Sequence, residues 1–381
     1  MITRQNAEAL FTEDLVAEII QGVTKQSAAL RMFRPLPKMS SSLMRMRVLD
    51  ALPLAYWVND ATDNGRKKLT EAAWANKYIV PAEIAVIVPI KEDVLDDASI
   101  DIWGEIRPRL VEAFGKKIDQ AIFAGVDKPS AWRADLLSSI AQAGAYVAQS
   151  GTLYSAINDA MVKVEESGYN PTGIVGGVDV KGKFRMMLDT SGQPIKGTEI
   201  DELPKAYIDN GAWDKTKAQM IIGDFTQAVY SIRQDISYKI LDQAIIQDPS
   251  TGDILYNLAQ EDMVALRVTM RLGWEIPNPI NALAPDESKR FPFAAIQATS
   301  ALTTNTVTFT VTDDGATGYV EGARVSFGGM VAKTNASGVA TFKTQNGVYQ
   351  YKITANGYQP YTGSVTVDGT EAVPVTLSAK S

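Results

Sequence analysis

The sequence predicts an α+β body over residues 1–297, joined by a linker at 298–306 to an all-β sandwich over 307–381. Three observations support this division. Helical and strand-like hydrophobic periodicities alternate in the body. Short segments of period two, punctuated by turn dipeptides, follow residue 306. The stretch between the two parts is small, polar and rich in threonine, which is typical of a linker.

The first elements of the body are an amphipathic helix and a hairpin. Apolar residues on one face predict a helix over 12–31. Leu54–Val58 and Tyr78–Ile90 alternate like strands, and the polar stretch between them contains an Asn64-Gly65 turn. We therefore expect a long hairpin that projects from the body. Since such a hairpin has little core of its own, it should need a neighbour to order against.

Two helices and two strand regions complete the body. Apolar residues at three- and four-residue spacing predict a long helix from a cap at Ser99 to about Ala124. A second helix is expected over 152–167, and Gly168 ends it. Strand-like patterns cover Met220–Ile240 and Ala265–Trp274.

The tail from residue 307 reads as a β-sandwich. Its strands are marked by alternating sets such as Val307, Phe309 and Val311, and turn dipeptides such as Asn346-Gly347 separate them. The tail has as many basic as acidic residues, so the formal net charge of −7 lies in the body.

The composition narrows the chemistry, because the chain has 381 residues and neither histidine nor cysteine. Disulfides, thiolate nucleophiles, imidazole bases and zinc sites built from His or Cys are excluded. The negative charge argues against an overall basic nucleic-acid binder. No secretory signal or membrane-spanning apolar run is present.

Three apparent motifs do not predict an active site. Gly177–Lys183 satisfies the P-loop spacing, but Phe184 replaces the Ser or Thr that binds magnesium, so an ordinary strand-to-helix turn is expected. Residues 60–71 match a calcium loop only in part and carry three central cations. Acidic pairs in polar segments are expected to be solvated surface rather than glycosidase carboxylates: Asp96–Asp97, Asp201–Glu202 and Glu261–Asp262. No catalytic, cofactor-binding or metal-binding residues are predicted.

Several blocks follow one another in order along the body: Tyr56-Trp57-Val58 with its polar hairpin, Pro89–Asp97 before the long helix, Gly173–Gly177 with Phe184–Pro194, Ile222–Phe225, and Asp262–Arg271 with Asn278-Pro279. Their order and spacing resemble the major capsid proteins of tailed bacteriophages with the Hong Kong 97-type fold. Three blocks of the tail resemble an immunoglobulin-like module of the carboxypeptidase regulatory type: Gly322–Phe327, Thr334–Phe342 and Gly347–Tyr358.

The resemblance implies a domain plan: an N-terminal arm at 1–50, an extended loop hairpin at 51–85, a peripheral domain with a spine helix at 86–130 and 225–297, and an axial domain at 131–224. It implies a non-enzymatic subunit that forms hexamers and pentamers of an icosahedral shell around double-stranded DNA. The shell would assemble in the host bacterial cytoplasm, without a membrane, and carry the sandwich on its surface.

The implied partners are further copies of the chain, a separate scaffolding protein, a portal, cement proteins and the enclosed DNA, which would be held by non-specific proximity. No cofactor is implied. Because the chain begins almost at the arm, scaffolding would be a separate protein or a segment already removed.

The resemblance also suggests a covalent link between subunits. Some members join a lysine of the extended loop to an asparagine of a neighbour, with a glutamate as base. Lys67 and Lys68 lie in the loop, and Glu275, Asn278 and Asn281 lie in the matching region. Intersubunit salt bridges of the loop lysines are the alternative.

Two other functions are also compatible with the sequence. A bacterial nanocompartment shell would share the fold but enclose cargo rather than DNA. A carboxylate-based glycan-active enzyme or adhesin, with the sandwich as an accessory domain, belongs to a different class.

Overall fold

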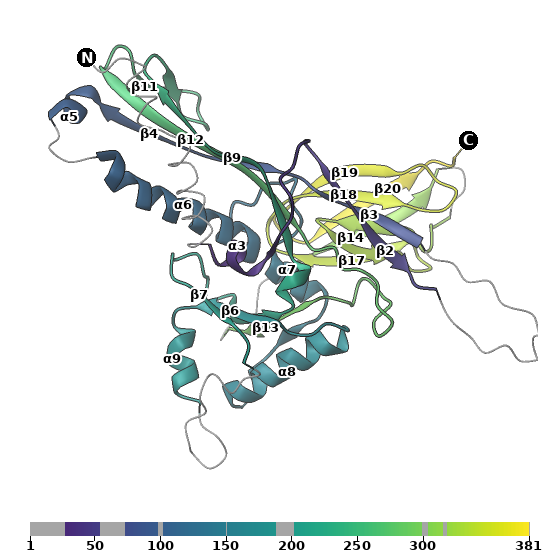
Figure 1. The fold of residues 1–381 in the computed structure, drawn as a ribbon. Helices are drawn as coiled ribbons and strands as arrows, with labels where there is room; N and C mark the ends of the chain where they lie inside the picture. Colours follow the sequence, from purple (N-terminus) through teal and green to yellow (C-terminus); the bar gives the residue numbers. More distant parts are fainter. Residues whose placement is uncertain are drawn as a thin grey trace, which may run out of the picture.

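The computed structural model describes residues 27–53, 73–97, 102–149, 151–187, 202–298, 304–314 and 318–380. They form an α+β body with a β-sandwich beside it (Figure 1). The body contains a four-stranded sheet and a five-stranded sheet, and one hydrophobic core contains residues of both. A second core fills the sandwich.

The described chain starts at a short helix, α3 (Ala28–Met32), which is anchored by a buried carboxylate. Asp119 accepts hydrogen bonds from Ser27 Oγ at 2.8 Å, from the first two amides of α3 at 3.1 and 3.0 Å, and from Asn210 Nδ2 at 3.0 Å. Burial raises the pKa of Asp119 in spite of these four donors. The rest of the helix predicted at 12–31 lies outside the described residues.

The base of the predicted hairpin consists of β2 (Met44–Ala51) and β3 (Ala73–Ile79), which pair antiparallel. The hairpin thus begins within the segment expected to be the arm, because residues 44–50 alternate in the strand pattern and hydrogen-bond to β3. The predicted strand at Leu54–Val58 and the Asn64-Gly65 turn lie outside the described residues.

The four-stranded sheet has the order β1-β9-β12-β4. Its members are β1 (Arg34–Pro35), β4 (Ala82–Lys91), β9 (Val229–Leu241) and β12 (Met263–Glu275). The strand predicted at Tyr78–Ile90 is divided between β3 and β4, which belong to different sheets. Pro81 lies at the break, where its missing N–H cannot continue a ladder.

The remaining elements of this region lie along one side of the long sheet and at its far end (Figure 1). The spine helix α6 (Ile102–Ala124) buries Phe114, Ile118 and Ile122 in the core. At the far end of the sheet lie α5 (Glu92–Asp97) and a small hairpin, β10 (Ile245–Gln247) with β11 (Ile254–Asn257).

The five-stranded sheet has the order β5-β13-β8-β6-β7. Its strands are β5 (Tyr146–Val147), β6 (Gly173–Gly177), β7 (Lys205–Ile208), β8 (Ala218–Gly223) and β13 (Phe293–Gln297). The helices of this region are α7 (Leu136–Gln142), α8 (Leu153–Glu166), α9 (Val180–Arg185) and the 3₁₀ turn η2 (Phe225–Gln227). Strand β13, which ends the segment 225–297 of the domain plan, pairs with β8 and β5 of this sheet.

The sandwich consists of the sheets β17-β14-β20 and β16-β15-β18-β19. The strands are β14 (Asn305–Asp313), β15 (Arg324–Phe327), β16 (Met330–Lys333), β17 (Val339–Thr344), β18 (Gly347–Thr354), β19 (Tyr361–Val367) and β20 (Glu371–Leu377). Phe309 on one sheet packs edge-on against Phe327 and Tyr351 on the other, with ring centroids 5.5 and 5.0 Å apart. The prediction of an all-β tail is confirmed, and its first strand begins at 305, inside the expected linker.

Candidate functional site: the junction of hairpin, body and sandwich

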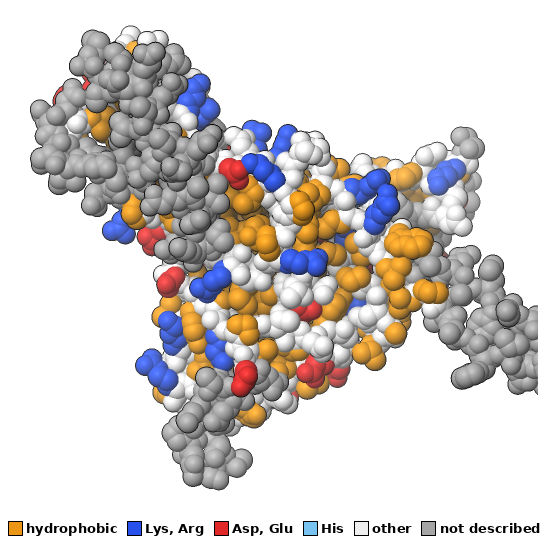
Figure 2. All heavy atoms as spheres, in the orientation of Figure 1, with side chains coloured by type: hydrophobic (Ala, Val, Ile, Leu, Met, Phe, Trp, Pro, Cys, Tyr) orange, Lys and Arg blue, Asp and Glu red, His pale blue; other side chains and the backbone are white. Residues whose placement is uncertain are grey.

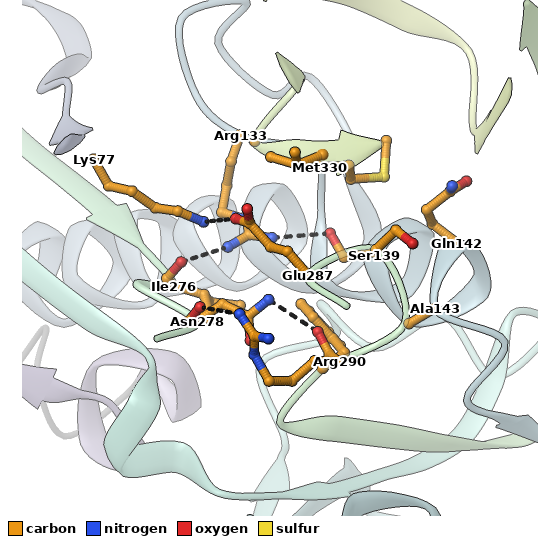
Figure 3. A pocket seen from close by; sticks show the side chains of 14 residues that line it. Lys77, Arg133, Ser139, Gln142, Ala143, Ile276, Asn278, Glu287, Arg290 and Met330 are labelled. Carbon is orange, nitrogen blue, oxygen red and sulfur yellow. Dashed lines mark hydrogen bonds and ion pairs between the residues drawn. The ribbon is translucent and has the colours of Figure 1, made fainter. Parts of the chain in front are cut away.

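A cavity lies where the hairpin base, the body and the sandwich meet (Figure 3). Lys77 comes from β3, Arg133 from the segment before α7, Glu287 and Arg290 from the loop between β12 and β13, and Met330 from β16. These positions are far apart in the sequence. The cavity therefore marks the point at which three parts of the fold are held in a fixed relation.

Glu287 is the central anion of this junction. Its carboxylate pairs with Lys77 at 3.0 Å and with Arg324 of β15 at 2.6 Å. The three side chains are only 17, 13 and 31% exposed, respectively. Burial alone would raise the pKa of Glu287, but the two cations outweigh it and hold the pKa below its usual range. One carboxylate thus links the hairpin to the sandwich through the loop of the body.

A second ion pair lies deeper. Arg133 donates to Glu275 Oε1 at 2.9 Å and to Ser139 Oγ at 3.3 Å. Its guanidinium group also lies 5.4 Å from the ring centroid of Trp274 and 5.8 Å from that of Phe291. Burial lowers the pKa of Arg133, and Glu275 opposes that effect. The pair therefore joins the end of β12 to the start of α7.

Arg290 organises the loop that carries Glu287. Its Nη1 donates to the carbonyl oxygens of Ala284 and Pro285 at 2.7 and 3.2 Å, and its Nη2 donates to that of Asn278 at 3.1 Å. The side chain is buried, and the residue as a whole is 3% exposed. These three hydrogen bonds hold the backbone of the loop together. Their acceptors are all backbone carbonyls, so none of them is a carboxylate.

Polar contacts also seat the sandwich on α7. The side-chain amide of Gln142 donates to Thr341 O at 3.3 Å and accepts from Lys343 N at 2.6 Å, so it pairs with the edge of β17 as a neighbouring strand would. Gln345 donates to Asp135 Oδ2 at 2.8 Å. These contacts fix the sandwich to the body by hydrogen bonds in addition to the ion pairs of Glu287.

A half-buried lysine lies at the same contact. Lys128 Nζ stands 4.5 Å from the ring centroid of Tyr349 on β18. Burial lowers the pKa of Lys128 to about 8, against the attraction of Asp135. Burial likewise raises the pKa values of Asp135 and Tyr349. All three pKa shifts arise from burial at the contact between the body and the sandwich.

The candidate crosslink residues have partners within the subunit. Glu275 holds Arg133, as described above. Asn278 accepts from Tyr169 Oη at 2.9 Å and donates to Arg290 O at 2.9 Å. Asn281 donates to Ser167 O at 2.7 Å and accepts from Ala284 N at 2.8 Å. The structure thus brings Glu275 and Asn278 to the junction, while Lys67 and Lys68 lie outside the described residues.

The other sequence motifs have structural roles or exposed positions. The P-loop-like segment is a turn between β6 and α9, as expected, and Lys183 donates to Gln219 Oε1 at 2.8 Å. Glu261 is exposed and accepts from Asn257 N at 2.9 Å. The calcium-loop segment lies outside the described residues. Within the described part of the chain, no group of three acidic side chains is placed to hold a metal ion, and no helix is long and apolar enough to span a membrane.

Sequence reasoning missed the junction residues Lys77, Arg133, Glu287, Arg290 and Arg324. Their ion-pair partners are far away in the chain, 142 positions for Arg133 and Glu275 and more for Lys77 and Glu287, so no local spacing connects them. The only local signal is at Arg133, a cation that lies with Asp135 in the otherwise apolar stretch Trp132–Leu137. Such a residue must find a buried partner, but the sequence does not tell which one.

Large apolar side chains are exposed on β3 and at the far tip of the four-stranded sheet, among other places. On β3, Trp74 is 67% and Tyr78 41% exposed. At the far tip of the four-stranded sheet, exposed apolar residues lie on α5, β10 and β11: Val94, Ile245, Ile254, Leu255 and Tyr256. Figure 2 shows hydrophobic side chains gathered over the part of the molecule where β2 and β3 lie. Exposed patches of this kind are typical of protein interfaces.

Comparisons with known proteins agree with this architecture. A curated relative, the major capsid protein of Staphylococcus phage 80alpha, is 23% identical over 283 residues, which cover 72% of this chain and 84% of the relative. A solved structure from Microbacterium phage Oxtober96 is 34% identical, with a TM-score of 0.65, and the match covers 78% of this chain and 99% of that one. A structure from Mycobacterium phage Bobi is 31% identical, with a TM-score of 0.64, over 79% and 99% of the two chains.

The family match defines where the chain resembles its relatives. Residues 8–285 match the phage capsid family, so the match ends before the sandwich begins at 305. The Hong Kong 97-type fold expected from the order of the sequence blocks is confirmed by the structural matches. The chain belongs to the phage capsid family.

Proposed function

We propose that the chain is the major capsid protein of a bacteriophage, a structural subunit that assembles into hexamers and pentamers of an icosahedral shell around double-stranded DNA. The proposal rests on family membership and on the hairpin. The hairpin base has only a small core, formed by residues such as Met44, Met46 and Ile79, and it exposes Trp74. A two-stranded hairpin of this kind is marginal alone, so a neighbouring subunit is its natural partner.

The charge of the chain supports the same role. A formal net charge of −7 repels DNA on average, which suits a container that must release its contents. The subunit needs no catalytic group in this role. We propose a separate scaffolding protein, a portal and cement proteins as further partners, with assembly in the host cytoplasm.

The test is co-expression of the full chain with the scaffolding protein of its phage, followed by negative-stain microscopy. Wild-type chain should form shells. Trp74→Ser should reduce the yield of shells at least about tenfold, because it removes a large apolar contact from the hairpin. Tyr319→Ser is the matched control, since Tyr319 is 60% exposed on the sandwich. Strict monomers of wild-type chain, or equal yields from both variants, would contradict the proposal.

We also propose that the sandwich is an immunoglobulin-like decoration on the outer surface of the shell. It lies outside the family match and is seated beside the body by Gln142 and Glu287. Because the chain has no histidine, a hexahistidine tag at the C-terminus gives a unique label. Nickel-coated gold should bind intact tagged shells. Binding only after the shells are broken would place the sandwich inside and refute the proposal.

A covalent link from Lys67 or Lys68 to Asn278 or Asn281, with Glu275 as base, is a second proposal. The hydrogen bonds of both asparagines within the subunit oppose it, because a link would have to break them. Non-covalent salt bridges of the two lysines are the competing proposal. Shells boiled in detergent should separate the two: a ladder of multimers supports the link, and a single band at 41.3 kDa excludes it.

A further inference from the structure

The junction cavity carries more buried positive than negative charge. Three cations line it, Lys77, Arg133 and Arg290, and the one carboxylate that lines it is that of Glu287. Just outside the lining, Glu275 pairs with Arg133, and the partly exposed Arg324 pairs with Glu287. Two further carboxylates lie nearby. Exposed Asp286 faces Lys289, and buried Asp135 attracts both Lys128 and Arg133, so Asp135 and Lys128 add one charge of each sign.

Burial makes this imbalance costly. Arg133 is 6% and Arg290 3% exposed, so water cannot screen either guanidinium group well. Within the described part of the chain, Glu275 forms an ion pair with Arg133, and Glu287 already faces two cations. Arg290 contacts backbone carbonyls and the Tyr169 hydroxyl, which solvate its charge without neutralising it.

Both arginines also have an unused donor. Within the described part of the chain, the buried Nε–H groups of Arg133 and Arg290 have no hydrogen-bond partner. A buried donor without an acceptor is rare in folded proteins. Here two of them belong to side chains that line one cavity, and Figure 3 shows both side chains around it with Glu287.

We propose that this cavity binds one small inorganic oxyanion, with Arg133 and Arg290 as its main ligands. A guanidinium group presents Nε–H and Nη–H donors in a rigid planar fork, which matches two oxygens of an oxyanion better than a spherical halide. A dianion such as phosphate would balance the two excess charges. The bound ion would tie the loop of Glu287 to α7 and so strengthen the seat of both hairpin and sandwich.

The test uses the full chain and inorganic phosphate at pH 7, with sodium chloride keeping the ionic strength constant. Calorimetric titration of the wild type should show saturable binding of one phosphate per chain. Thermal unfolding should shift upward with phosphate concentration and not with chloride, since a ligand that binds only the folded state stabilises it.

Two variants localise the site. Arg290→Met should weaken phosphate binding at least about tenfold, a loss of ~1.4 kcal/mol in binding free energy. Lys289→Met is the matched control, because Lys289 adjoins Arg290 in sequence but is 83% exposed and does not line the cavity. It should leave binding unchanged.

Phosphate binding by the wild-type chain tests the proposal even if Arg290→Met does not fold. No saturable binding below about 10 mM phosphate would overturn it, since this corresponds to under ~3 kcal/mol of binding free energy. Loss of binding in Lys289→Met would also overturn it, because the anion would then lie on the surface. An anomalous peak of selenate between Arg133 and Arg290 in soaked crystals would support it, and a peak elsewhere only would refute it.

Discussion

Glu287→Gln should destabilise the subunit far more than an ordinary surface charge change. The substitution keeps the shape of the side chain but removes the carboxylate that faces Lys77 and Arg324. Breaking a fully buried ion pair costs about 3–5 kcal/mol. Because Arg324 is 31% exposed and regains some hydration, we expect ~2–4 kcal/mol for this variant at pH 7.

Urea unfolding of the full chain, followed by tryptophan fluorescence, measures this loss. The matched control is Asp286→Asn, one residue earlier in the same loop. Asp286 is 55% exposed and lies 3.9 Å from a lysine that is 83% exposed, so its loss should stay within ~0.5 kcal/mol. Equal losses for the two variants would refute the reasoning.

The pH dependence of stability provides a second comparison of wild type and Glu287→Gln. In the folded chain the pKa of Glu287 lies below its ordinary value of 4.5. Its stabilising contribution is therefore fully present above pH 4.5 and is lost as the pH falls through the lower folded value. The stability gap between wild type and Glu287→Gln should narrow below pH 4.5 and stay constant between pH 6 and 8. A gap that persists unchanged at pH 3 would show that the charge is not the cause.

Two further predictions concern the N-terminal anchor and a sandwich turn. Asp119→Ala leaves four buried donors without their acceptor and should lower the free energy of unfolding, measured in urea, by ~3 kcal/mol. The control Asp253→Ala removes an exposed carboxylate and should lower it by under ~0.5 kcal/mol. Similar losses for the two variants would contradict the anchoring role of Asp119. Gly338→Ala should lower the thermal midpoint more than Gly252→Ala. Both glycines have positive φ, +68° and +78°, but only at Gly338 would the new methyl group overlap a backbone oxygen, that of Val311. Equal shifts of the thermal midpoint would mean that the loss of stability comes from backbone strain alone and not from the overlap with Val311.

Much of the fold could be predicted because its signals are local. The helix expected at 152–167 is α8 at Leu153–Glu166, and Gly168, with φ +79°, ends it as expected. The alternation of Val307, Phe309 and Val311 gives a strand whose three side chains are fully buried. Periodicity is enough in such cases, since each element buries one face whatever the partner.

Boundaries that depend on pairing were harder to predict. Residues 44–50 and Phe293–Gln297 both look like strands, but their sheets are chosen by distant partners, β3 and β8. The division of Tyr78–Ile90 into two strands likewise depends on β3 and β4 joining different sheets. Sequence patterns specify which face of a strand is apolar, and they do not specify the neighbour.

The sequence by itself determined the α+β body, the all-β tail, the absence of His- and Cys-based chemistry and, through the order of its blocks, the capsid fold. Only the tertiary structure decided how hairpin, body and sandwich are joined. Glu287 meets Lys77 and Arg324 across 210 and 37 positions of the chain, and the excess of buried cations appears only when these segments meet. The physical reason is that hydrophobic burial follows local periodicity. The contribution of a buried charge to stability depends instead on which distant group the fold places beside it.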